Sequence, residues 1–225
     1  MHRNSFRTYN PTSFNCINNG GFNMKHMIRS ILRAILGTIV ALILIVVVYI
    51  LLPITYTLQI GDINTDYVNN QKPTIIAVLQ LADFNDTVEL DINSRGGYAD
   101  EAFLLVNEMK NSSATVVTHV TYRAFSAGAI IAMGGDRIKA NESSSFLFHM
   151  PFYLAGNPFE PSKVLVTKDD PMYTVNINFM QRYVFPCLTQ DELDLYLNDK
   201  GDAVIIDGKN MLERIEKYKK FRDLH

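Results

Sequence analysis

Hydrophobic and polar positions divide the chain into an apolar N-terminal segment and a longer part in which two periodicities alternate. Residues 34–54 run without a charge, whereas apolar and polar residues alternate over 55–63 and apolar residues recur at helical spacing over 98–110. Alternation with period two is typical of a half-buried strand, and the wider spacing is typical of an amphipathic helix. The pattern therefore predicts one apolar helix followed by an α/β domain.

Strands and helices are expected to follow one another in turn within that domain, which places functional residues at strand-to-helix turns. The expected strands are 55–63, 87–93, 114–120 and the run ending at His149; the expected helices begin at Pro73 and near residues 98, 127, 172, 189 and 208. Pro151, Pro158, Pro161 and Pro171 indicate a loop before the helix at 172–183.

The apolar segment 34–54 has the length of a membrane anchor. Its 21 residues would form a helix of roughly 30 Å, which matches the hydrocarbon layer of a bilayer. A cleaved secretory signal would have a shorter apolar region, and the exit sequence LLPITYTLQIG offers no small-x-small cleavage site. We therefore expect an uncleaved transmembrane helix.

Charge is distributed unevenly around this anchor. The first 54 residues hold five Lys or Arg and no acid, whereas the rest holds 16 basic and 23 acidic residues. Basic flanks stay in the cytoplasm, so we expect a single-pass protein with a cytoplasmic N-terminus and its large domain on the far side, periplasmic or extracellular. An acidic domain lacks the basic patch that grips phosphate backbones, so no nucleic acid partner is expected.

Residues 1–33 are expected to form a disordered, basic cytoplasmic segment, because the first 23 are rich in Asn and lack apolar periodicity. Met24 or Met27 would each make a conventional start. Cys16 precedes the anchor and Cys187 follows it, so the two cannot pair on this topology. They form no metal-binding cluster, and we expect neither a metal nor a cofactor.

Ser126 lies among small residues in YRAFSAGAIIAMGG, where a strand pattern gives way to a helical one. The free N–H groups and the dipole at a helix N-terminus favour negative charge, which suits a nucleophile whose reaction creates an oxyanion. Small residues also permit close helix packing. This segment alone leaves both interpretations open.

Two other segments carry candidate chemistry. Gly96 and Gly97 end the strand TVELDIN, and paired glycines either let a backbone N–H approach a ligand closely or form a simple turn. His149 follows alternating large apolar residues in SSSFLFHMPF. A lone histidine in such a strand is either a base or a hydrogen-bonded core residue.

Taken together, INSRGG, AFSAGA and FLFHMP, in this order and at these separations, resemble the Clp peptidase family, whose segments read approximately INSPGG, AASMGA and MIHQP. The resemblance runs from about Thr55 to Ile215 and is strongest from Pro73 to Pro151. It implies that residues 55–225 form a ClpP/crotonase-like β/α spiral domain with serine endopeptidase activity.

The resemblance assigns a role to each matching residue. Ser126 would attack the scissile carbonyl, while His149 would take its proton and later deliver it to the leaving amine. Backbone N–H groups of Gly97 and Ala127 would hold the oxyanion. The family implies peptide or unfolded protein substrates and a homo-oligomer, and on the far side of a membrane the enzyme would work without ATP.

The third member of the implied triad is an acid that precedes a short apolar strand. Asp199 and Asp202 in DKGDAVIIDG are both near enough. We choose Asp202 because it stands two residues before Val204, as the family's acid stands before a large apolar residue.

Two departures from the family pattern keep other functions open. Arg95 replaces a proline before the glycines, and Phe125 replaces a small residue before the serine. These two replacements leave open a protein that has the same fold but binds its partner without catalysis. A peptidase of the signal-peptide peptidase A type would instead use a Ser–Lys pair, with Lys139, Lys163 or Lys168 as its base. A crotonase-like acyl-CoA enzyme shares the fold, but a translocated domain would lack its substrates.

Overall fold

The computed structural model of this protein describes residues 24–157, 160–198 and 201–223. The chain divides into two compact units, Met1–Leu51 and Leu52–His225. Disorder was expected over residues 1–33, but residues 24–33 belong to the helix α1. Residues 1–23 and the alternative acid Asp199 lie outside the described residues.

The first unit contains one long helix, α1 (Met24–Leu51). It begins before the expected start at Ala34 and ends before Ile54, because Pro53 disfavours helical geometry at the preceding residue. Its stretch Met24–Val48 is long and apolar enough to cross a membrane, and the most apolar part of it is not buried within the protein. A helix of this length and composition is typical of a single membrane span.

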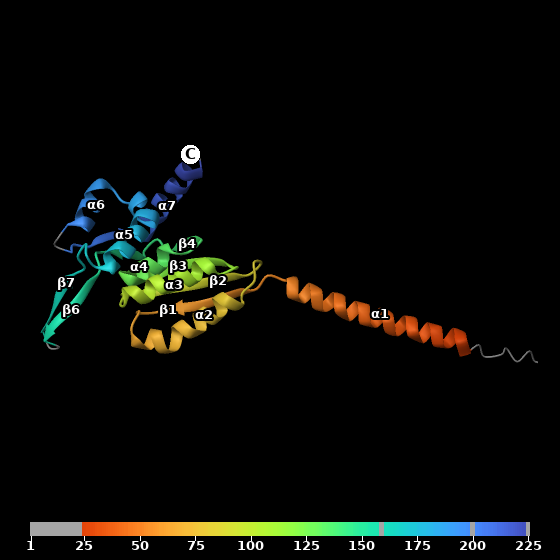
Figure 1. The fold of residues 1–225 in the computed structure, drawn as a ribbon. Coiled ribbons are helices and arrows are strands. Elements are labelled where there is room, and N and C mark those ends of the chain that lie inside the picture. The colour runs from red at the N-terminus through yellow and green to blue at the C-terminus, as the bar shows by residue number, and fades with distance from the viewer. Residues whose placement is uncertain (1–23, 158–159, 199–200, 224–225) are drawn as a thin grey trace, which may run out of the picture. The chain divides into compact units, whose positions relative to one another are not determined.

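The second unit is an α/β domain, as predicted, and its elements can be followed by colour in Figure 1. The strands are β1 (Thr55–Ile60), β2 (Thr87–Ser94), β3 (Thr115–Phe125), β4 (Arg137–Ala140), β5 (Ser145–Phe148), β6 (Phe152–Asn157), β7 (Glu160–Leu165) and β8 (Val204–Asp207). The helices are α2 (Lys72–Leu81), α3 (Ala99–Asn111), α4 (Ala127–Met133), α5 (Pro171–Tyr183), α6 (Gln190–Leu197) and α7 (Gly208–Asp223), with short turns η1 (Tyr67–Gln71) and η2 (Phe185–Cys187).

Six strands form one sheet in the order β1-β2-β3-β5-β8, with β4 also pairing with β3. All neighbours are parallel except β5 and β8. Parallel neighbours need a crossover, which α2 supplies between β1 and β2 and α3 supplies between β2 and β3. The carboxyl ends of β2 and β3 consequently lie side by side, with Ser94 opposite Ala124.

One face of this sheet packs into the core. Along β2, Val88, Leu90 and Ile92 are fully buried, and the residues between them are half-buried. Helix α4 packs against β2 and β3, and α3 packs against α4 and α2. Each fully buried Val, Leu or Ile contributes roughly 1.5–3 kcal/mol, so this face stabilises the region from which the site is built.

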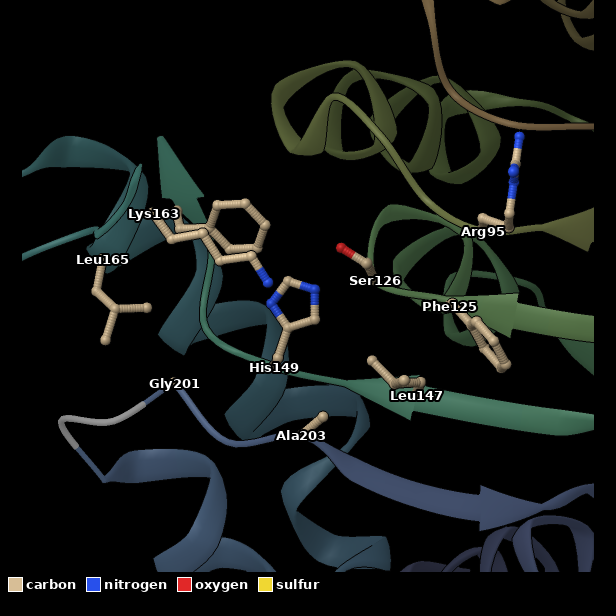
Figure 2. Close-up of a pocket in the computed structure, with 10 residues that line it drawn as sticks. Arg95, Phe125, Ser126, Leu147, His149, Lys163, Leu165, Gly201 and Ala203 are labelled. Atoms are coloured by element: carbon tan, nitrogen blue, oxygen red, sulfur yellow. The ribbon is translucent and has the colours of Figure 1, made fainter. Parts of the chain in front are cut away.

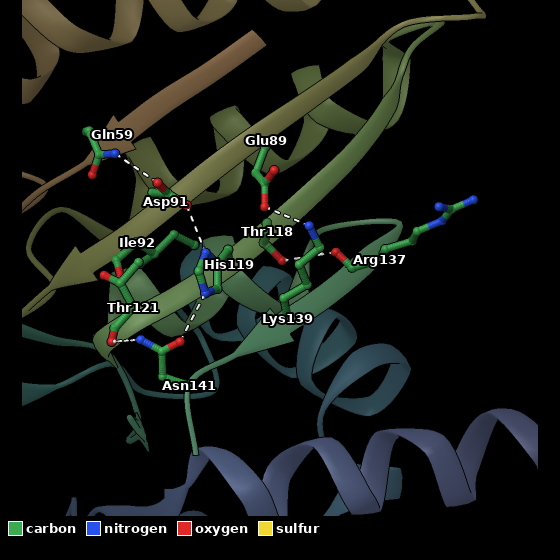
Figure 3. A network of polar contacts seen from close by, with 10 residues as sticks. All are labelled: Gln59, Glu89, Asp91, Ile92, Thr118, His119, Thr121, Arg137, Lys139 and Asn141. Atoms are coloured by element: carbon green, nitrogen blue, oxygen red, sulfur yellow. Dashed lines mark hydrogen bonds and ion pairs between the residues drawn. The ribbon is translucent and has the colours of Figure 1, made fainter. Parts of the chain in front are cut away.

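The opposite face carries a row of polar side chains, shown in Figure 3. The pairing of the strands aligns Gln59, Asp91, His119 and Lys139 across β1, β2, β3 and β4. Gln59 donates to Asp91 at 2.9 Å, and Asp91 lies 3.0 Å from His119 Nδ1. Lys139 donates to Glu89 at 2.8 Å. Parallel sheets usually have two apolar faces, so this face departs from the common pattern.

Strands β6 and β7 form an antiparallel hairpin, which corrects the loop predicted for this part of the chain. Strands β6 and β7 pair only with each other, and Phe152 lies opposite Leu165. A two-stranded sheet consists of edge strands, which tolerate proline because one side of each strand needs no ladder hydrogen bond. Pro161 therefore lies within an edge strand, Pro151 directly precedes β6, and Pro171 is the first residue of α5.

Candidate active site

The turn from β3 to α4 holds Ser126 in a strained conformation. Ser126 is the N-cap of α4, as the sequence predicted, with φ 54° and ψ −119°. Among the described residues it is the one non-glycine residue with positive φ. Its N–H donates to the Leu147 carbonyl at 2.8 Å, which ties the turn to β5. Strain of this kind costs about 1–3 kcal/mol and is concentrated at functional sites.

Gly96 lies directly against this turn. A Cβ at Gly96 would approach the Ser126 Cβ and the Phe125 carbonyl oxygen to 2.7 Å each, and the φ of Gly96 is +101°. Gly97 has a φ of +140° and passes close to the backbone of Ile63. Only glycine permits both the positive φ and the close approach, so this pair does more than end a strand.

His149 follows β5 and is oriented by its neighbours. Its Nδ1 lies 2.7 Å from the Met150 carbonyl oxygen, which can only accept, so Nδ1 carries the proton and donates. The ring stacks on Phe152, with centroids 5.3 Å apart. Nε2 is thereby left unprotonated, which is the form that a general base requires.

The pKa of His149 is lowered from its ordinary value. Burial is the largest cause, and the Lys163 ammonium lowers the pKa further, whereas the hydrogen bond to Met150 opposes both effects. The neutral imidazole is therefore favoured in the folded protein.

Ser126 and His149 line one open cavity of about 620 Å³, and Figure 2 shows that the serine hydroxyl and the imidazole face the same space. The structure thus brings together two residues that lie 23 positions apart and that the sequence had paired. The other residues that line this cavity are Arg95, Phe125, Leu147, Phe152, Lys163, Leu165, Gly201 and Ala203.

The two proposed oxyanion donors belong to the turns on either side of Ser126. Ala127 is the first residue of α4, where backbone N–H groups have no acceptor within the helix. Gly97 follows Gly96, which contacts Ser126 and approaches the Ala127 nitrogen. Both N–H groups therefore come from segments that border the nucleophile.

Arg95 is held by an ion pair at the rim of this cavity. Its backbone N–H and its Nε donate to the two carboxylate oxygens of Asp62 at 2.6 and 2.7 Å. These bonds hold the pKa of Asp62 below its ordinary value. The restraint that the family's proline would supply to this turn is supplied here by Asp62.

Asp202 lies in a segment that borders the cavity without bonding to the histidine. Its neighbours Gly201 and Ala203 line the cavity, and its own Oδ2 accepts from Asn198 at 2.8 Å. Among the described residues, no carboxylate hydrogen-bonds to His149.

Of the three lysines that the sequence offered as a base for a Ser–Lys pair, Lys163 on β7 is the one that lies at the site. It lines the cavity, and its Nζ lies 4.6 Å from the centroid of the Phe152 ring. Lys139, by contrast, is paired with Glu89 on the polar sheet face, and Lys168 does not line the cavity. The pairing of β6 with β7 brings Lys163 to the site, and the residue pattern did not predict this pairing.

One cluster outside the cavity has the composition of a metal site. Glu89, Asp91 and His119 each offer a ligand atom within 4.8 Å of the others. Lys139 already neutralises Glu89, and Asp91 and Asn141 each contact a ring nitrogen of His119. Because these groups satisfy one another, we assign no metal to them.

Comparison with known proteins agrees with this geometry. A family model described as Clp protease matches residues 47–164, which is more than half of the chain. A search of curated proteins finds no match. Two solved structures of the 1510-N membrane-bound stomatin-specific protease share the fold, one a serine-to-alanine mutant and the other a lysine-to-alanine mutant in complex with a substrate peptide. The serine-to-alanine mutant has a TM-score of 0.54 and 19% identity, and the match covers 72% of this chain and 76% of the other. The lysine-to-alanine mutant has a TM-score of 0.53 and 18% identity, and the match covers 72% of each chain.

Proposed function

Since the chain belongs to the Clp protease family, as its three motifs predicted, we propose that it is a serine endopeptidase held at a membrane by α1. The observation that carries this proposal is the geometry at Ser126. Its strained turn presents the hydroxyl to a cavity that it shares with a neutral, oriented imidazole.

Acyl transfer at this site would begin with attack of the Ser126 Oγ on the scissile carbonyl. His149 Nε2 takes the hydroxyl proton, and the carbonyl oxygen becomes an oxyanion that the N–H groups of Gly97 and Ala127 stabilise. The imidazolium then gives its proton to the leaving amine. Water repeats the sequence on the acyl-enzyme and releases the second product.

Asp202 is the residue that we propose as the third member of the triad. The Met150 carbonyl accepts from Nδ1 in this structure, and Asp202 lies between two residues that line the cavity. A carboxylate that replaced this carbonyl would stabilise the imidazolium by charge as well as by orientation.

The setting of the site supports peptide or unfolded protein segments as substrates. We propose a single-pass protein with a cytoplasmic N-terminus and its catalytic domain on the periplasmic or extracellular side, where hydrolysis would proceed without ATP. The family also supports assembly into a homo-oligomer.

Serine-probe labelling of the full-length protein in detergent tests the nucleophile and the base together. We expect a fluorophosphonate to label wild type, to leave Ser126→Ala unlabelled and to label His149→Ala far more slowly. The matched control is Ser113→Ala, which changes an exposed serine that does not line the cavity. Unchanged labelling of Ser126→Ala would refute the proposal.

A Ser–Lys mechanism is the second candidate, because Lys163 shares the cavity with Ser126 and its charge acts on His149. A lysine can serve as the base that activates a serine. Hydrolysis that survives His149→Gln and is lost in Lys163→Met would support this candidate over the Ser–His mechanism.

A further inference from the structure

We propose that this enzyme cleaves after small residues, alanine or serine, because a second and narrow cavity beside Ser126 receives the side chain at P1, the residue whose carbonyl is attacked. The inference rests on the proposed peptidase function. It concerns Asn176 and Met180 of α5, which the mechanism above does not use.

The position of this cavity assigns it to P1. Its lining includes Ser126 and His149, together with Ile130 of α4 and Ala99, which lies two residues after the proposed oxyanion donor Gly97. The P1 side chain branches from the carbon bonded to the scissile carbonyl. The open cavity of about 620 Å³ also borders Ser126 and His149, but it lacks Ala99 and Ile130. We therefore assign the P1 side chain to the narrow cavity, which lies toward the segment of Gly97.

The volume of the cavity limits what it can take. It measures about 20 Å³, and a space of roughly 10–15 Å³ already holds one water molecule. A methyl or hydroxymethyl group fits such a space, whereas a leucine or phenylalanine side chain does not.

The walls of the cavity are buried and packed. Ile130, Phe148 and Met180 are between 2% and 6% exposed and belong to the main core. Close-packed interiors have few voids into which side chains can withdraw, so enlarging the cavity for a bulky P1 group would cost stability.

Asn176 makes part of the lining polar. The residue is 1% exposed, and its Nδ2 donates to the Tyr196 hydroxyl at 2.6 Å and lies 3.6 Å from the Met150 sulfur. Asn176 lines the cavity. A polar wall favours a P1 side chain that can form a hydrogen bond, as the serine hydroxyl can.

A series of peptides that differ only at P1 tests this proposal on the full-length protein in detergent. We expect kcat/KM for peptides with alanine or serine at P1 to exceed that for peptides with leucine or phenylalanine at P1 by at least about tenfold. A side chain that does not fit a rigid pocket lowers kcat/KM by roughly 10–200-fold. Equal or faster cleavage after leucine or phenylalanine would overturn the proposal and leave the peptidase function standing.

Variants of the wall provide the second part of the test. Met180→Ala should raise the leucine-to-alanine ratio of kcat/KM by about tenfold, and Ile130→Val should raise it less while disturbing the fold less. Asn176→Ala should lower cleavage after serine relative to alanine. Unchanged ratios in all three variants would contradict the assignment of this cavity to P1.

The matched control is Val175→Ala, on the same helix but with its side chain 47% exposed, which should leave the P1 profile unchanged. Fluorophosphonate labelling of each variant separates the two proposals, because it reports Ser126 and His149 without a P1 side chain. Wild type that neither labels nor cleaves any peptide would refute the peptidase function itself.

Discussion

His149 is half-buried and lies beside a cation, and both its burial and the cation lower its pKa from the ordinary value of 6.5. A base must be unprotonated, so kcat/KM falls as the pH drops through the pKa of the free enzyme. With a lowered pKa, we expect the fall to occur below pH 6.5, which a pH profile of peptide hydrolysis would measure. Lys163→Met removes the cation, raises the pKa and should move the fall to higher pH.

Lys139→Met is the control for this profile, because it removes an equal charge on the polar sheet face. It should leave the pH profile in place. A Lys163→Met profile that stays unchanged or moves to lower pH would contradict the electrostatic interpretation.

Asp202 can be tested against a neighbouring aspartate. If it orients His149 during catalysis, Asp202→Asn should lower kcat by at least about tenfold and by up to roughly 10⁴-fold, the range seen when a triad acid is lost. Asp207→Asn is the control, because Asp207 accepts two hydrogen bonds from Asn210, away from the cavity, and an asparagine can keep one of them. Full activity of Asp202→Asn would leave the Met150 carbonyl as the group that orients the imidazole.

Individual residues differ in how far the sequence could predict them. Ser126 and His149 could be predicted, because each follows a strand with a clear pattern and each lies in one of the three ordered motifs. Lys163 could be named only as one of three candidate lysines, since its position depends on how β6 and β7 pair. The contact between His149 and the Met150 carbonyl depends on side-chain rotation, which no periodicity reports.

At the scale of elements, the site depends on how closely the turn after β2 approaches the turn after β3. Gly96→Ala should abolish hydrolysis, because its Cβ would meet Ser126 and Phe125 at 2.7 Å and its φ is positive. Peptide hydrolysis and probe labelling would both report the loss.

Gly61→Ala is the matched control, because a Cβ there would meet only the far end of the Gln71 side chain, at 3.7 Å. It should retain activity. An active Gly96→Ala enzyme would show that the two turns can separate without loss of the site.

Elements with a single strong periodicity could be predicted. The helix expected at 98–110 is α3, and the strand expected at 114–120 continues as β3 to Phe125. The hairpin could not be predicted, because prolines that normally end strands are tolerated at its unpaired edges. The short length of β8 likewise gives too few residues for a periodicity.

At the scale of the whole molecule, the proposed orientation can be tested with the chain's own cysteine. A membrane-impermeant maleimide added to intact cells should label an Asp169→Cys variant, since Asp169 is exposed in the catalytic unit. Cys16 should react only after the cells are permeabilised, because it precedes the span. The native Cys187 is buried and should contribute little.

The reverse pattern, with Cys16 labelled in intact cells and Asp169→Cys protected, would place the catalytic unit in the cytoplasm. An ATP-driven partner would then be compatible with the fold, and the ATP-independent part of the proposed function would be wrong.

The polar row on the open sheet face also bears on how the chain reaches this fold. Neighbouring parallel strands are joined by long crossovers, so no tight turn sets their alignment. A slip of one residue between β2 and β3 would turn Asp91 or His119 toward the helices and leave its polar group without a partner. The row therefore penalises mispaired sheets, and substitutions there should increase misfolding and aggregation even though they lie away from the catalytic serine.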